Sequence, residues 1–406
     1  MNTRMNRRQW LKRSAAAATG LLVAPEFIAC RRQSPFSRSS PETEEIVLLD
    51  NNESPYGMPP EAREAVLDSL ARANRYPHKM YSALAALIAE KEGLPKDHVI
   101  LGAGSTEVMN MAILSYGVKG EIVTADPTYF DFIFYAGQAK CRIRKVPVSE
   151  RYELDLDAMI SRMSRETSLV YVCNPNNPTG AIVNKRKLRA FCEEVSKKAL
   201  VVVDEAYHEY VEDEAYASMA DLVREGMNVA VTRTFSKIFG MAGLRVGYGM
   251  ARPDIQKNFE RVQMNFASIA YPSLRAAIAA YGASAFTSLV REKNRAVRAY
   301  LEKQLEGLGY SCIPSHANFS LFEVRRDPKE MAADLAKHGI LIRPFDFAGK
   351  SWLRVSVGTE GEIHAFISAL EQIELVAEGF SRADVAIQNW GQLTHAPNYS
   401  GVLPDT

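Results

Sequence analysis

The sequence has few cysteines and almost no net charge, and both facts limit what the protein can be. It holds 5 cysteines in 406 residues. Four of them show neither paired spacing nor the spacing of metal ligands, and we interpret them as buried thiols: Cys141, Cys173, Cys192 and Cys312. Lysine plus arginine number 49 and aspartate plus glutamate 48, so no basic surface for nucleic acid or an anionic membrane is indicated. We therefore expect a soluble protein that binds small molecules and no metal.

Residues 1–30 differ in character from the rest of the chain. Arg7 and Arg8 precede an apolar stretch at 15–24, a pattern that resembles a twin-arginine export signal. That stretch is too short to span a bilayer, and the alternative is a basic N-terminus followed by a chance apolar run. Because the twin-arginine machinery carries folded proteins, the pattern predicts a protein that folds in the cytoplasm and is then exported to the periplasm. Cys30 is a candidate for lipid attachment, which would anchor the protein to the membrane.

The rest of the chain predicts an α/β fold that begins near residue 46. Residues 31–45 have no apolar period and are typical of a linker or arm. Helical patterns at 62–73, 83–91, 106–115 and 188–197 alternate with short apolar runs at 99–101, 122–125, 169–173, 200–203 and 229–232. This alternation favours a mostly parallel sheet flanked by helices on both faces, in a large domain of about residues 75–255.

A smaller α+β domain is expected from residues 46–74 and 256–375. Residues 254–308 have a long helical pattern, and strand-like segments at 318–324 and 352–357 flank a helix at 329–338. The tail, residues 376–406, has little periodicity, and we assign it no role.

The sequence around Lys237 is typical of a lysine that reacts with an aldehyde beside a phosphate. Thr234 and Ser236 supply hydroxyl groups, and Arg245 follows eight residues after the lysine. A lysine amine becomes nucleophilic when its surroundings lower its pKa, and hydroxyl and guanidinium groups suit a phosphate. Most Ser-Lys pairs are solvated surface groups, but the glycines around this apolar segment make that alternative less favourable.

Two further motifs follow predicted strands. Asp204 ends an apolar run, where a carboxylate needs a cationic partner such as a protonated pyridine nitrogen. Asn177 lies in an Asn-Pro-Asn-Asn-Pro-Thr-Gly loop at 174–180, whose prolines make it rigid. A helix cap for the aspartate and a simple turn for the loop are the structural alternatives.

Two more segments also follow strands and suit a cofactor with a phosphate and a ring. Ser105 and Thr106 open a helix after a glycine-containing turn, where backbone amides and the helix dipole attract phosphate. Tyr129 offers an aromatic face to a ring, although it would be equally credible as part of the core.

Together these motifs resemble the fold-type-I pyridoxal-phosphate enzymes and, among them, the histidinol-phosphate aminotransferase family, from about residue 49 to residue 373. The resemblance implies that Lys237 forms a Schiff base and shuttles protons. It implies that Asp204 pairs with the pyridinium nitrogen, Tyr207 and Asn177 bond the ring oxygen, and Tyr129 stacks on the ring. The phosphate would be held by Ser105, Thr106, Thr234, Ser236 and Arg245, with Tyr76 reaching over from the second subunit of a homodimer. Arg354, with Asn177 nearby, would bind the substrate α-carboxylate, and Arg343 would meet the distal substrate group.

Two departures from the family pattern bear on the substrate. Phe36 stands where the family carries an arm tyrosine that helps bind the substrate phosphate, and Arg343 is followed by Phe345, Asp346 and Phe347. We therefore expect an aromatic or other non-phosphorylated amino acid as the amino donor, with a histidinol-phosphate-like amine as the alternative donor and a 2-oxo acid as acceptor. The alternatives are a decarboxylase similar to threonine-phosphate decarboxylase, and a pyridoxal-phosphate-binding module without catalysis.

Overall fold

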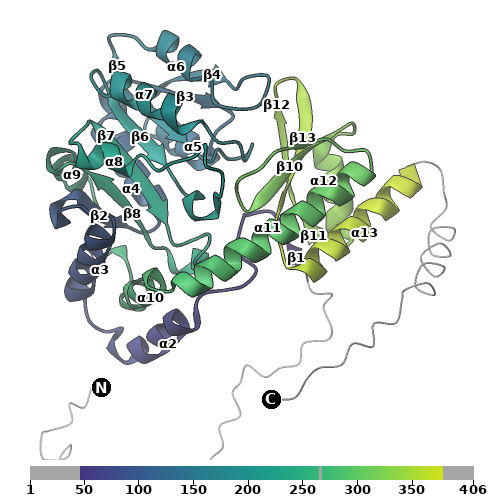
Figure 1. Cartoon of the computed structure of the whole chain (residues 1–406), viewed down its shortest axis with the longest axis horizontal. Coiled ribbons are helices and arrows are strands. Elements are labelled where there is room, and N and C mark those ends of the chain that lie inside the picture. Colours follow the sequence, from purple (N-terminus) through teal and green to yellow (C-terminus); the bar gives the residue numbers. More distant parts are fainter. Residues whose placement is uncertain (1–45, 265–267, 378–406) are drawn as a thin grey trace, which may run out of the picture. The chain divides into compact units, whose positions relative to one another are not determined.

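The computed structural model describes residues 46–264 and 268–377, which form a large helix-flanked sheet and a smaller α+β part (Figure 1). The large sheet has seven strands in the order β2-β8-β7-β6-β5-β3-β4. Its bounds are β2 (Val99–Gly102), β3 (Glu121–Asp126), β4 (Arg142–Pro147), β5 (Thr167–Cys173), β6 (Leu200–Asp204), β7 (Val229–Thr234) and β8 (Gly247–Ala251). Only β8 runs antiparallel to its neighbours, so the predicted mostly parallel sheet is confirmed.

Alternate side chains along the strands pack into two separate cores, one on each face of the sheet. This is expected when helices cover both faces of a parallel sheet. On β6, Val201 and Val203 pack into one cluster, while Leu200 and Val202 pack into the other. The first core includes residues of α3 (His78–Lys91), α6 (Leu156–Arg162), α7 (Lys185–Val195) and α8 (Ala220–Arg224). The second includes residues of α4 (Ser105–Ser115), α5 (Phe130–Gln138) and α9 (Pro253–Glu260).

The smaller part has an antiparallel sheet in the order β12-β13-β10-β9 and its own core. The strands are β9 (Cys312–Ile313), β10 (Phe319–Val324), β12 (Arg343–Phe347) and β13 (Lys350–Ser356). Helices α11 (Ser284–Gly307), α12 (Pro328–Lys337) and α13 (Glu360–Ala377) pack with it. The chain's first described segment joins it, because β1 (Val47–Leu48) pairs in parallel with β11 (Ile340–Leu341).

The long helical pattern at 254–308 forms three helices rather than one. After α9 come α10 (Tyr271–Tyr281), with a proline in its first turn, and α11, which begins two residues beyond Gly282. Helix α10 packs closely on α2 (Pro60–Ser69), and both contribute to a core of the large sheet. Both helices fall within the ranges expected for the small domain, 46–74 and 256–375, because helical periodicity does not reveal which sheet a helix covers.

Two strands of the large sheet were not predicted, for different reasons. The edge strand β4 carries exposed charges and only one fully buried side chain, Val146, so it has no apolar run. Charged residues are common on edge strands, where they discourage pairing with another chain. Strand β8 is rich in glycine, which is unfavourable in strands by propensity.

Five 3-10 turns complete the described chain: Leu70–Arg72, Lys96–His98, Gly117–Lys119, His208–Tyr210 and Ala242–Leu244. Within the two described ranges, no helix has both the length and the apolar character needed to cross a membrane. The predicted export signal, Cys30, the 31–45 arm with Phe36 and almost all of the 376–406 tail lie outside the described residues.

Candidate active site

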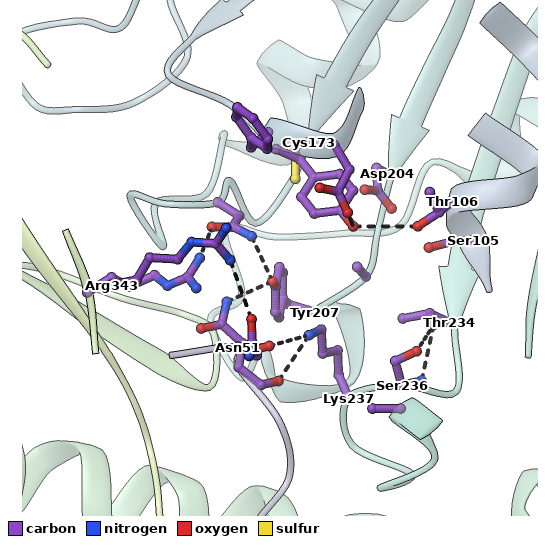
Figure 2. A pocket seen from close by; sticks show the side chains of 18 of the residues that line it. Asn51, Ser105, Thr106, Cys173, Asp204, Tyr207, Thr234, Ser236, Lys237 and Arg343 are labelled. Atoms are coloured by element: carbon purple, nitrogen blue, oxygen red, sulfur yellow. Dashed lines mark hydrogen bonds between the residues drawn. The ribbon is translucent and has the colours of Figure 1, made fainter. Parts of the chain in front are cut away.

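The carboxyl ends of the central strands open into one cavity of about 810 Å³. Cys173, Asp204 and Thr234 are the last residues of β5, β6 and β7, and all three line it. Residues from the small part close the other side, including Arg343 and Arg354. Figure 2 shows side chains from both parts pointing into this space, which is where open α/β sheets bind ligands.

Asp204 lies at the inner end of the cavity and is 2% exposed. Its carboxylate accepts hydrogen bonds from the Tyr171 hydroxyl and from Thr232 Oγ1, each at 2.9 Å. Burial raises its pKa to about 6, although these two hydrogen bonds oppose the shift. A buried carboxylate of this kind is stabilised by a cation placed against it.

Lys237 follows β7 and projects into the middle of the cavity (Figure 2). Its Nζ donates to the backbone carbonyls of Asn51 at 3.1 Å and Asn52 at 3.0 Å. Burial lowers its pKa to about 7, and Arg354 and Arg245 add to the shift by repulsion. A substantial fraction of this amine is therefore neutral, and nucleophilic, near pH 7.

A cluster of hydroxyl and guanidinium groups lies at the start of α4. Ser105 is the first residue of this helix, and Thr106 follows it into the cavity lining. Thr234 Oγ1 donates to Ser236 Oγ at 2.9 Å, and Arg245 Nη1 donates to the same oxygen at 3.3 Å. The free backbone amides of a helix N-terminus together with these donors suit an anion such as a phosphate.

Two glycines bring backbone close to this part of the site. Gly104 has φ +81°, and a Cβ there would overlap the Arg245 guanidinium. Gly240 has φ +61°, and a Cβ there would overlap the carbonyl of Gly57. A larger residue at position 104 would displace Arg245, which lines the cavity, and one at position 240 would displace the segment at Gly57.

Aromatic and amide groups lie between the acid and the lysine. The Tyr207 hydroxyl accepts hydrogen bonds from Asn177 Nδ2 at 3.1 Å and Asn52 Nδ2 at 3.0 Å. Tyr129 is half-buried and donates to Asp131 Oδ2 at 2.7 Å, so its ring is fixed at the cavity wall. These groups give this part of the cavity both aromatic surface and hydrogen-bonding groups.

Arg354, on β13, is a buried cation, and one of its N–H groups has no hydrogen-bond acceptor. It is 3% exposed, and it donates to Asn177 Oδ1 and to the Asp50 carbonyl, both at 2.6 Å. Its Nε is buried without a hydrogen-bond partner. Burial lowers its pKa to about 10. A carboxylate bound beside it would supply the missing charge and acceptor.

The outer wall of the cavity combines aromatic and charged side chains. Phe345 lines it and lies 5.4 Å from the Arg354 guanidinium carbon, measured to the ring centroid. Arg343 is exposed, and its Nη1 donates to Asn51 Oδ1 at 3.4 Å. Asp346 also lines the cavity, and so do Phe130, Tyr135 and Lys329.

Some sequence expectations need correction. Phe347 does not line the cavity but stacks on Trp352 at 5.2 Å between ring centroids, so only one of the two phenylalanines faces the site. Cys173 and Cys192 are buried, but Cys141 and Cys312 are only half-buried. Tyr76 is a different case: it is 77% exposed and does not line the cavity of its own chain, and its role at the partner's site stays a prediction.

All other predicted site residues line the cavity, and the sequence reasoning missed some of their partners. Tyr171 and Thr232 bond Asp204 from neighbouring strands, which only the strand order reveals. Asn52 donates to the Tyr207 hydroxyl from a segment far away in the sequence, a contact that no local pattern indicates. Nothing in the sequence singled out Lys329 as a site residue, because lysines near the start of a helix are common on protein surfaces.

The model of the aminotransferase class I and II family matches residues 44–370. The chain belongs to this family. It is 39% identical to the histidinol-phosphate aminotransferase of Moorella thermoacetica over 81% of this chain and 86% of that one. It is 37% identical to histidinol-phosphate aminotransferase 1 of Cupriavidus pinatubonensis, over 80% of this chain and 88% of that one. A solved histidinol-phosphate aminotransferase from Sinorhizobium meliloti, in complex with pyridoxal-5'-phosphate, matches with 26% identity and a TM-score of 0.75, over 80% and 90% of the two chains.

The protein is thus a pyridoxal-phosphate-dependent aminotransferase, and its cavity fits that cofactor. The buried Asp204 carboxylate suits the pyridine nitrogen, and the hydroxyl and guanidinium cluster suits the phosphate. The amine of Lys237 lies in the same cavity and suits the aldehyde. Among the described residues, no three His, Cys, Asp or Glu side chains gather as they would around a metal ion.

Proposed function

We propose that this aminotransferase acts on an unphosphorylated α-amino acid whose side chain is a flat ring, with a 2-oxo acid as acceptor. The observation that carries the proposal is the pairing of Arg354 with Phe345 at the cavity wall. The buried guanidinium suits an α-carboxylate, and the phenylalanine beside it suits an apolar or aromatic side chain.

The residues that hold the cofactor follow from the chemistry of the cavity. We assign Asp204 to the pyridine nitrogen, Tyr207 and Asn177 to the ring oxygen and Tyr129 to the ring face. Five residues hold the phosphate: Ser105, Thr106, Thr234, Ser236 and Arg245. When bound, the cofactor withdraws electrons from the substrate Cα, which makes the Cα proton easier to remove.

Lys237 is the group that holds and moves protons. Its amine has a pKa of about 7, so it gains and loses a proton readily at neutral pH. Its Nζ contacts two backbone carbonyls, which accept its hydrogen bonds and hold it in the cavity. We propose that this nitrogen carries the proton between neighbouring substrate atoms.

Arg354 positions the substrate by its carboxylate. The bond from its Nη1 to Asn177 Oδ1 fixes the guanidinium, and the unpartnered Nε offers a further donor. Both the amino acid and the 2-oxo acid carry a carboxylate next to the reacting carbon, so one arginine serves both halves of the reaction.

Arg343 then lies on the side of the distal substrate group. Asp346 in the same wall reduces the local positive charge, and Phe345 and Phe130 add apolar surface. A ring without a phosphate fits this balance better than a dianion does.

Histidinol phosphate is the second candidate substrate. Both curated relatives described above are named for it, at 39% and 37% identity. Lys329 and Arg343 also add two cations to the cavity lining, which would favour a phosphate.

A panel of amines distinguishes the two candidates. Purified enzyme with bound cofactor is offered phenylalanine, tyrosine, histidine and histidinol phosphate, and conversion to the pyridoxamine form is followed by absorbance. We expect the aromatic amino acids to convert fastest. Efficient conversion of histidinol phosphate alone would reject the proposal. Release of CO₂ without a 2-oxo acid product would identify a decarboxylase instead.

We also propose that the enzyme works as a homodimer and is exported. Members of this family are typically dimeric, and the dimer proposal is supported by exposed apolar side chains on α2 and just after it: Leu67, Leu70 and Tyr76. Export to the periplasm rests on Arg7, Arg8 and the apolar stretch at 15–24. Lipid attachment at Cys30 would add a membrane anchor.

A further inference from the structure

The oxygen of the Tyr207 hydroxyl accepts two hydrogen bonds, and this limits where its own hydrogen points. The two donors are Asn177 Nδ2 at 3.1 Å and Asn52 Nδ2 at 3.0 Å. A phenol oxygen accepts at most two hydrogen bonds, so both of its acceptor positions are used. In the part of the chain that the structure describes, this hydroxyl donates to no protein group.

The orientation of the first amide is fixed by Arg354. A guanidinium only donates, and Arg354 Nη1 contacts Asn177 Oδ1 at 2.6 Å. The oxygen of Asn177 therefore faces the arginine, and its NH₂ group faces Tyr207. The carboxylate-binding arginine and the tyrosine are linked through this one amide.

The second amide, from Asn52, is held by contacts on every side. Asn52 is 1% exposed, and its φ is +54°, a left-handed conformation that asparagine adopts more readily than most residues. Its N–H donates to Ser356 Oγ at 2.8 Å, and its Oδ1 accepts from that oxygen at 3.3 Å. Its carbonyl accepts from Asn318 Nδ2 and from Lys237 Nζ, both at 3.0 Å.

We propose that Asn52 is a positioning residue that turns the Tyr207 hydroxyl hydrogen into the cavity, toward the ring oxygen of the cofactor. By donating to the tyrosine oxygen, its amide leaves the hydroxyl hydrogen no acceptor except one in the cavity. This inference rests on the proposed contact between Tyr207 and the ring oxygen. It gives a role to a residue on the segment before α2, far in sequence from the cofactor-binding strands.

The consequence is an electronic one that absorbance can measure. A hydroxyl that donates to the ring oxygen stabilises the negative charge on that oxygen. The bound cofactor then loses its titratable proton more easily, so its pKa is lower. Without that donor, the pKa read from the visible absorbance of the bound cofactor should rise. One hydrogen bond corresponds to roughly one pKa unit, or about tenfold in the ionisation equilibrium.

The test compares two substitutions that separate orientation from packing. Asn52→Gly removes the amide but keeps a residue that tolerates positive φ. Asn52→Asp keeps the shape but offers acceptors in place of the NH₂ donor, so the Tyr207 hydrogen would turn toward residue 52. Each variant is loaded with pyridoxal phosphate and titrated from about pH 5 to pH 10 by absorbance, and its cofactor dissociation constant is measured.

We expect the absorbance pKa to rise by roughly one unit in Asn52→Gly and by more in Asn52→Asp. The carboxylate of Asn52→Asp also raises this pKa through its own negative charge, so the uncharged Asn52→Gly variant decides, and a role in packing alone predicts weaker cofactor binding there without a pKa shift. In both variants kcat should fall more than KM for the amino acid rises. Ser356→Ala, which loosens Asn52 without touching Tyr207, should shift the pKa in the same direction by less.

An unchanged absorbance pKa in Asn52→Gly would overturn the inference, whatever the shift in Asn52→Asp. The titration uses no amine substrate, so it does not depend on the result of the amine panel. A wild-type protein that fails to bind pyridoxal phosphate would overturn the cofactor assignment together with this inference.

Discussion

Lys237 and Asp204 are both shifted by burial toward their neutral forms, and both would be stabilised by the same bound cofactor. The lysine has a pKa of about 7 and the aspartate one of about 6. Two ionisable side chains that lie in one cavity, each buried at a cost in free energy, are typical of a functional site rather than a structural one.

The first prediction concerns the ionisation of Lys237. Its folded pKa of about 7 lies below the ordinary value of 10.5, so the unfolded chain binds more protons between these two pH values. The stability of the cofactor-free protein should therefore rise with pH across this window, and the penalty should be complete below pH 7. Lys237→Met should raise the melting temperature at pH 7 and have little effect near pH 10.

The same variant tests catalysis. Lys237→Met should abolish turnover, because no other amine is assigned to carry the proton. The matched control is Lys329→Met, which changes a lysine at the outer wall and should retain turnover of aromatic amino acids. Normal turnover in Lys237→Met would remove this lysine from its assigned role.

The second prediction concerns Asp204. Its raised pKa means that the folded protein bears the cost of the buried charge above about pH 6, and that this cost disappears as pH falls toward 4. The cofactor's ring nitrogen offsets this cost, so the gain in melting temperature on loading should be larger at pH 7.5 than at pH 5. Asp204→Asn should reduce this pH dependence and lower kcat by roughly a hundredfold or more. A loading effect with the same pH dependence in both proteins would contradict the assignment.

At the scale of elements, the site is built where strands end and where two parts of the chain meet. The sheet positions Asp204 and Thr234 at neighbouring strand ends, whereas Arg343 and Arg354 are cross-strand partners on β12 and β13. The first pair defines the cofactor side and the second pair the substrate side.

The third prediction separates the two arginines of that antiparallel pair. Arg354 is buried and meets a group common to all amino acids, so Arg354→Ala should lower kcat/KM by roughly a hundredfold to a few thousandfold for every substrate. Arg343 is exposed, and Arg343→Ala should spare aromatic amino acids while reducing turnover of amines with an anionic side chain. Equal losses for all substrates in both variants would show that the two arginines share one role.

The sequence was sufficient to predict those elements and site residues whose evidence is local. Apolar runs followed by polar residues predicted β5, β6 and β7, and the residues after them predicted the cofactor side of the cavity. Contacts between distant segments were not accessible in this way. The bond from Asn52 to Tyr207 spans 155 positions, and no periodicity reports it. The prediction that Phe347 faces the substrate was also wrong, because its ring stacks on Trp352, which belongs to another strand.

At the scale of the whole molecule, the described chain leaves Tyr76 exposed and outside its own cavity. The fourth prediction is that this tyrosine serves the partner's site in a homodimer. Hybrid dimers of a Tyr76→Phe chain and a Lys237→Ala chain should contain one site with both groups intact, and should recover about half of the wild-type activity per dimer. Differently tagged chains allow the hybrid to be purified, and no recovery in it would show that Tyr76 acts within its own chain.

The fifth prediction concerns export. Replacing Arg7 and Arg8 together with lysine should retain active enzyme in the cytoplasm, because the twin-arginine machinery reads the arginine pair itself. The matched control replaces Arg31 and Arg32 with lysine, since this second pair follows the apolar stretch and should not affect export. Cell fractions are compared by immunoblot and by transaminase activity. Undiminished enzyme in the periplasm after loss of the first pair would show that residues 1–30 have another function.

The close backbone approaches at Gly104 and Gly240 also bear on how this enzyme can evolve. A side chain at either position would overlap Arg245 or the Gly57 carbonyl, so these two positions, on the segments that carry Ser105 and Lys237, tolerate little variation. The opposite wall, at residues 343–346, is made of side chains from an antiparallel strand. In a random library selected on a new amine, accepted substitutions should therefore gather at that wall and be missing from the two glycines. Mutations at that wall can then change which amine the enzyme accepts, while the residues that carry out transamination stay the same.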